Sequence, residues 1–182
     1  MTIRQHQTAA PVESILAPHP TVFPVTTTAV TVSGTSYAFA LPVTAYPRLI
    51  MRALFNVSGA GSGAVVGEVA IGTSPASVLS SATVSATITP QIVQSLGSVS
   101  LISTGFRNVA IGAGYTVAAG TQAWLMFRTA VTIAQPTFPQ LSGMAGFCGS
   151  RSLAASGVLT VGSGLSFTAT TVSVPAIMLA SV

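Results

Sequence analysis

The sequence RLIMRALFNV-SGAGSG-AVVGEVAI, residues 48–71, gives the clearest indication of the fold. In its first ten residues the odd-numbered positions form one apolar face: Leu49, Met51, Ala53, Phe55 and Val57. The even-numbered positions are more polar, with Ile50 and Leu54 as exceptions. Alternation at every second residue is typical of a β-strand with one buried face. A glycine-rich turn and a second run of Val, Ala and Ile follow, so the stretch predicts two antiparallel strands.

We expect these two strands to pair as a hairpin around residues 58–63. Inward residues must face inward residues in such a pair, and the register that centres the turn places Arg52 opposite Glu68. The hairpin therefore predicts a cross-strand ion pair between Arg52 and Glu68, worth about 0.2–1 kcal/mol if it is exposed. The alternative is that the strands lie in opposite sheets of a sandwich, which would separate the two residues.

From residue 21 onward the chain continues as short β-branched runs separated by Gly, Ser and Pro. We expect further strands at 26–32, 37–43, 98–102, 123–131, 158–161 and 167–174, with the closing segment 177–182 as an extension of the last one. The best short helical candidates are 74–79 and 89–96. The glycine clusters at 59–63 and 112–114 are expected to form hairpin turns. This pattern predicts an all-β sandwich or barrel.

Residues 1–20 differ from the rest of the chain. They contain both histidines, one of the two glutamates and three prolines, and they show no sustained periodicity. We predict an extended N-terminal arm over 1–20 and a β-sandwich domain over 21–182. The arm is expected to dock the protein to a neighbour through Arg4, His6, Pro11, Pro18, His19 and Pro20.

Charged residues make up 4% of the 182 residues, compared with about 25% in an ordinary soluble domain. The chain has six arginines, two glutamates, and neither lysine nor aspartate. General acid–base catalysis needs titratable groups that converge in a pocket, whereas His6, Glu13 and His19 all lie in the expected arm. These three also lack a compact metal-ligand spacing. We therefore expect no enzyme activity, no metal and no cofactor.

The formal net charge is +4, but the arginines are scattered along the chain. Phosphate binding normally shows as clustered Lys and Arg, so we expect no nucleic-acid partner. The longest charge-free stretch, 152–182, is interrupted by glycine and proline, and no membrane span is expected. Residues 1–7 lack the apolar core of a signal peptide. The single Cys148 excludes an intramolecular disulfide and is expected to be a small buried residue.

The strand expected at 123–131 is apolar on both faces. Leu125 and Phe127 lie on one face and Trp124 and Met126 on the other. The strand should therefore be central in its sheet or be covered on its outer side by a partner. Trp124 has three interpretations: a core residue beneath a loop, an anchor between subunits, or a sugar-stacking platform. The candidate subunit interface consists of Trp124, Met126, Arg128, Ile50 and Leu54.

The sequence GTQAWLM at residues 120–126, together with IGTSPASVL at 71–79, resembles strands of the β-sandwich, jelly-roll-like domains of tailed-bacteriophage virion proteins. The resemblance covers about residues 48–131. It departs at Gln122-Ala123, where an aromatic residue commonly follows the threonine, so no binding residues are carried over. The resemblance implies an antiparallel β-sandwich, jelly-roll-like, that oligomerises, often as a trimer, and attaches through an N-terminal segment.

We therefore expect a non-enzymatic structural component of a phage virion, made in the host cytoplasm. It would be a tail appendage or fibre subunit, or a capsid-decorating protein. Its expected partners are copies of itself, as a homotrimer, and other virion proteins, with neither nucleic acid nor membrane among them. The alternative is a carbohydrate-binding module that recognises a host surface glycan. That alternative requires an exposed aromatic side chain, with Trp124 and Tyr115 as the candidates.

Overall fold

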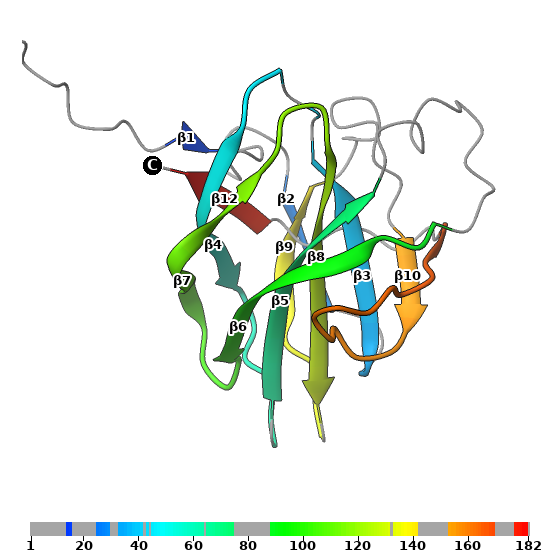
Figure 1. The fold of residues 1–182 in the computed structure, drawn as a ribbon. Coiled ribbons are helices and arrows are strands. Elements are labelled where there is room, and N and C mark those ends of the chain that lie inside the picture. The colour runs from blue at the N-terminus through cyan, green and yellow to red at the C-terminus, as the bar shows by residue number, and fades with distance from the viewer. Residues whose placement is uncertain are drawn as a thin grey trace, which may run out of the picture.

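The computed structural model shows two antiparallel β-sheets packed against each other (Figure 1). It describes residues 14–15, 25–29, 33–41, 43, 45–63, 65–74, 88–131, 133–141, 153–169 and 177–181. Within these residues, all of the regular secondary structure is β-strand, and no helix is present. The predicted all-β sandwich is confirmed.

Twelve strands make up the described part of the fold. They are β1 (Ser14–Ile15), β2 (Val25–Ala29), β3 (Thr35–Ala40), β4 (Arg48–Val57), β5 (Val65–Ser74), β6 (Gln91–Ser100), β7 (Gly105–Val117), β8 (Gln122–Val131), β9 (Thr137–Leu141), β10 (Leu153–Ser156), β11 (Thr168–Ala169) and β12 (Ile177–Ser181). One sheet has the order β1-β12-β4-β7 and the other has the order β11-β10-β3-β8-β5-β6. Strands β2 and β9 pair separately.

The path of the chain between the two main sheets is that of a jelly roll. From β1 the chain passes to β3 in the second sheet, returns to β4, and forms the β5–β6 pair in the second sheet. It then returns to β7, crosses to β8, and ends in β12 between β1 and β4. These eight strands give two four-stranded sheets, β1-β12-β4-β7 and β3-β8-β5-β6, which is the jelly-roll order. Strands β10 and β11 extend the second sheet beyond β3.

Strands β4 and β5 do not form the expected hairpin. β4 pairs with β12 and β7, whereas β5 pairs with β6 and β8, so residues 58–63 connect the two sheets. The predicted ion pair between Arg52 and Glu68 is therefore wrong. Arg52 lies opposite Ala110 in one sheet, and Glu68 lies opposite Arg128 in the other.

The glycine cluster at 112–114 lies within β7 and not in the expected hairpin turn. The pairing between β4 and β7 shifts register between Ile50 and Arg52, so β7 bulges at this point. Gly114 has a φ of 69°, which glycine adopts readily and other residues rarely do. A Cβ atom at this position would lie 2.6 Å from the sulfur of Met51. The bulge therefore needs a glycine.

The bulge also changes which residues of β4 face the core. Ala53 and Val57 are buried, as the alternation predicts, but Ile50 is buried as well, with 1% of its surface exposed. Leu49 and Met51 are only partly buried. The inward face of β4 changes phase across this irregularity, from Ile50 on one side to Ala53 and Val57 on the other. Ile50 thus belongs to the core, and its prediction as a subunit contact is wrong.

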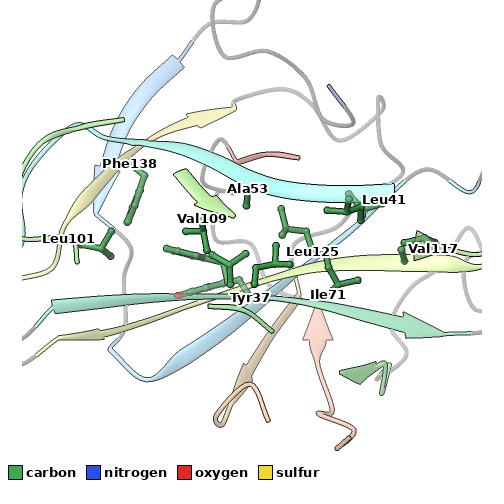
Figure 2. Packing of buried hydrophobic residues seen from close by; sticks show 14 of the residues in the cluster. Tyr37, Leu41, Ala53, Ile71, Leu101, Val109, Val117, Leu125 and Phe138 are labelled. Carbon is green, nitrogen blue, oxygen red and sulfur yellow. The ribbon is translucent and has the colours of Figure 1, made fainter. Parts of the chain in front are cut away.

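The main core fills the space between the two sheets (Figure 2). Ala53 of β4 faces this space from one sheet, and Tyr37, Ile71 and Leu125 face it from the other. The rings of Phe127 and Phe138 pack edge to face, with their centroids 5.4 Å apart. Each fully buried Leu, Ile or Phe side chain contributes about 1.5–3 kcal/mol, so this layer stabilises the pairing of the sheets.

Three further predictions of local structure are wrong. The helix expected at 89–96 is replaced by β6, which runs through most of that range. The strand expected at 158–161 is a loop and a turn. The closing strand β12 does not extend β11, because the two belong to different sheets. Most of the other helical candidate, 75–79, lies outside the described residues.

The part of the expected arm that the structure describes is a strand of the sandwich. Ser14 and Ile15 pair with Ser181 and Ala180, so β1 forms one edge of the four-stranded sheet, beside β12 (Figure 1). Outside the described residues lie the proposed docking residues Arg4, His6, Pro11, Pro18, His19 and Pro20, and also Cys148.

Candidate functional site

A second apolar cluster lies on the outer face of the six-stranded sheet, and the chain itself covers it. Its buried members are Ala38, Ala70, Ile88, Ile92, Trp124, Met126, Ala155, Leu159 and Phe167. The residues of β3, β5 and β8 in this cluster alternate with residues of the main core. Strand β8 is therefore central, as predicted. Its outer side is covered by residues 157–167, which we call the cover segment.

Backbone hydrogen bonds fix the cover segment to the start of β6. The N–H of Ile88 donates to the carbonyl of Phe167 at 3.0 Å, and the N–H of Phe167 donates back at 2.8 Å. Further along, Ile92 donates to the carbonyl of Ser163 at 2.9 Å and accepts from Gly162 at 2.8 Å. The cover segment is thus part of the folded sandwich.

Trp124 is a core residue beneath this segment, which confirms one of its three interpretations. Its side chain is 1% exposed, and Nε1 donates to the hydroxyl of Ser74 at 2.8 Å. Neither a sugar ring nor another subunit can reach a side chain so fully buried. The predictions of Trp124 and Met126 as subunit contacts are therefore wrong. Leu54, another predicted contact, is partly buried in β4.

Arg128 forms the ion pair that had been expected of Arg52. Its Nη1 lies 3.0 Å from Oε2 of Glu68 on the neighbouring strand β5, and both side chains are partly buried. Its Nε also donates to the carbonyl of Gly34 at 3.4 Å. The pair joins β5 to β8 and, through Gly34, to the segment that leads into β3.

Three large apolar side chains are strongly exposed at the end of the sandwich that holds the β4–β5 loop, which is the lower end in Figure 1. Ile102 is 58%, Phe106 73% and Ile133 79% exposed. We call these three residues the tip patch. They come from the β6–β7 loop, the start of β7 and the β8–β9 loop. No alternation marked them in the sequence, since each lies beside polar or small residues in or next to a loop.

The β4–β5 loop brings these segments together. The N–H of Gly61 donates to the carbonyl of Leu101, and the N–H of Ser62 donates to the carbonyl of Ala134, both at 3.0 Å. Because Gly61 and Ser62 are consecutive, Leu101 and Ala134 are close neighbours. Ile102 follows Leu101 and Ile133 precedes Ala134, so the two isoleucines share one end of the molecule.

Arg107 organises the loop that carries Ile102. Its guanidinium donates to the hydroxyl of Ser103 and to four backbone carbonyls, those of Ser100, Ser103, Thr104 and Phe106. All of these acceptors lie within seven residues of Arg107, so the loop closes around the side chain. The arginine holds this loop in one shape.

No protein-family model matches the chain, and a search of curated proteins finds no significant match. The resemblance to phage virion domains therefore stays a prediction from the sequence.

The tip patch is suited to contact and not to reaction, because it presents side chains of Ile and Phe around a loop of Gly, Ala and Ser. Among the residues that the structure describes, no three His, Cys, Asp or Glu side chains come together as a possible metal site. Within the same residues, no helix is long and apolar enough to cross a membrane.

Proposed function

We propose that the chain is a non-enzymatic structural component of a bacteriophage virion, either a tail appendage or fibre subunit or a head-decoration protein. The observation that carries the proposal is the strand order β1-β12-β4-β7 and β3-β8-β5-β6. Jelly-roll sandwiches with this order recur in viral capsid and lectin domains. The step from fold to role is an analogy.

The way in which charged side chains are paired within the described residues supports the same role. Glu68 and Arg128 neutralise each other, and the guanidinium of Arg107 is directed into its own loop. A surface with so little charge has little like-charge repulsion to keep copies apart. Such a surface is suited to a protein whose copies pack closely in an assembly.

The site geometry does not favour the carbohydrate-binding alternative. A sugar platform needs an exposed aromatic ring with polar neighbours. Trp124 is buried, and Tyr115 is partly buried and packs against the main core. What speaks for this alternative is the fold, which lectins share, and the ring of Tyr46, which is 79% exposed.

The proposal is tested in particles of the phage that encodes this chain. An antibody against the chain should label purified particles at fixed positions in electron micrographs. Antigen found only outside the particle fraction of the lysate would overturn the proposal.

A truncation tests whether the N-terminal segment attaches the protein. Removing residues 2–13 keeps the strand β1 in place, so the variant should fold, as judged by circular dichroism, and be absent from particles. A control in which a Gly-Ser linker of equal length replaces residues 2–13 separates the role of this sequence from its length. Normal incorporation of both variants would show that attachment does not use this segment.

A further inference from the structure

We infer that the tip patch, formed by Ile102, Phe106 and Ile133, is a contact surface for a second copy of this chain. The inference rests on the proposed function, in which copies of the chain assemble. It also replaces the interface expected from the sequence, whose residues Trp124, Met126 and Ile50 are buried within a single chain.

The side chains of the tip patch have the chemistry of an interface. Phe106 and Ile133 are among the three most exposed large apolar side chains of the described residues. Single exposed apolar residues are common on protein surfaces, but a group of them on one end marks an interaction site. Interface cores are enriched in aromatic side chains and depleted of charge. The patch has both properties.

The patch is also held in shape before any partner binds. Arg107 fixes the β6–β7 loop through five hydrogen bonds. The hydroxyl groups of Ser58 and Thr137 lie 3.1 Å apart and join the β4–β5 loop to β9. Binding through a rigid surface loses less conformational entropy than binding through mobile loops.

The lack of charge around the patch favours a second copy as the partner. In residues 57–66, 100–107 and 131–137, which surround the patch, Arg107 is the one charged residue, and it donates its hydrogen bonds within its own loop. A highly charged partner would find no opposite charge here. A second copy, in contrast, presents an equally neutral surface, because a two-fold contact puts the same patch on both sides. No like charges then face each other across the contact.

The patch is small, which sets the expected strength of the contact. A stable interface involves about 20–30 residues on each side, so the tip contact should be weak between two isolated copies. Within an assembly that presents many copies, weak contacts reinforce one another through the high effective concentration.

Analytical ultracentrifugation of the full chain tests the inference. We expect the average mass of the wild type to rise with concentration between about 10 μM and 1 mM, the range of weak complexes. In the triple variant I102S/F106S/I133S the dissociation constant should be raised at least tenfold. The matched control V43S/V158S/V161S removes three exposed valines elsewhere on the chain and should behave like the wild type. A wild type that stays monomeric, a tip variant that associates normally, or an equal loss in the control would each overturn the inference.

Cross-linking covers the case in which the triple variant fails to fold. In a Cys148→Ser background, Ile133→Cys should give a covalent dimer with a short bifunctional maleimide, and Val158→Cys should give none. Equal dimer yields at both positions would overturn the inference. The two proposals can fail separately. If the antibody labels the particles but the chain associates independently of the tip, the virion role stands and only this contact is lost.

Discussion

Two regions of this molecule present large apolar side chains away from the main core, and the chain covers only one of them. On the outer face of the six-stranded sheet, Trp124 is buried beneath the cover segment, with 1% of its surface exposed. At the tip of the sandwich, Phe106 is 73% exposed on the first residues of β7. The two aromatic side chains have similar chemistry and opposite environments.

An apolar residue at an outward strand position therefore does not by itself predict a contact between subunits. What decides is whether another segment of the same chain can reach and cover it. The cover segment does so with Leu159 and Phe167, and its backbone is hydrogen-bonded to β6. We therefore expect substitutions in the first region to change stability and substitutions in the second to change association.

The largest effect is expected for Trp124→Ala. Removing a fully buried tryptophan leaves a cavity, and here it also removes the donor of the hydrogen bond to the hydroxyl of Ser74. Such substitutions lower the unfolding free energy by about 3–5 kcal/mol. Urea denaturation of the variant and the wild type measures this. A loss below about 1 kcal/mol, the size of an ordinary surface change, would show that the cover segment does not hold Trp124 in a packed core.

A loss of about 3 kcal/mol is expected for Phe167→Ala, at the lower end of the range for buried phenylalanine because the cover segment can partly collapse. The substitution should loosen the cover segment and expose the face beneath it, so the variant should bind more of the dye ANS than the wild type. Val161→Ala, at an exposed position of the same segment, is the matched control and should change neither property. If Phe167→Ala left dye binding unchanged, the cover segment would not be what shields this face.

A double-mutant cycle on Glu68→Gln and Arg128→Met should give a coupling of about 0.5–1 kcal/mol, typical of an ion pair that is partly exposed. The same cycle on Glu68→Gln and Arg52→Met should give none, because the two residues lie in different sheets. Thermal or urea unfolding of the wild type and of the single and double variants gives the unfolding free energies from which the coupling is calculated. Coupling between Arg52 and Glu68 would support the hairpin register and contradict the sheet order.

The sequence predicted strands well and their partners poorly. The alternation in residues 48–57 matches β4, since a period of two is a local property. Whether β5 pairs with β4 or crosses to the other sheet depends on contacts far along the chain, which local periodicity does not carry. For the same reason the sequence pairs Glu68 with Arg52, although its partner in the structure, Arg128, lies 60 residues away.

The sequence also predicted little of the surface. The cover segment shows no alternation that would predict its place over a sheet, and its apolar residues favour a strand at 158–161. The glycine cluster of the β7 bulge favours a turn, because glycine clusters are common to both. The tip patch arises only when three separate segments meet at the β4–β5 loop, so no local pattern could have predicted it.

The smallest change in stability is expected for Phe106→Ala, and it is the sharpest test of the comparison. The side chain is exposed, so the unfolding free energy should stay within about 0.5 kcal/mol of the wild type. Association should nevertheless weaken several-fold in sedimentation experiments, because the ring lies in the proposed contact. Trp124→Ala should show the reverse order of effects, a large loss of stability with association changed only as far as the protein unfolds. If Phe106→Ala destabilised the chain as strongly as Trp124→Ala does, the ring would be part of the packed fold, and the two regions would differ in degree and not in role.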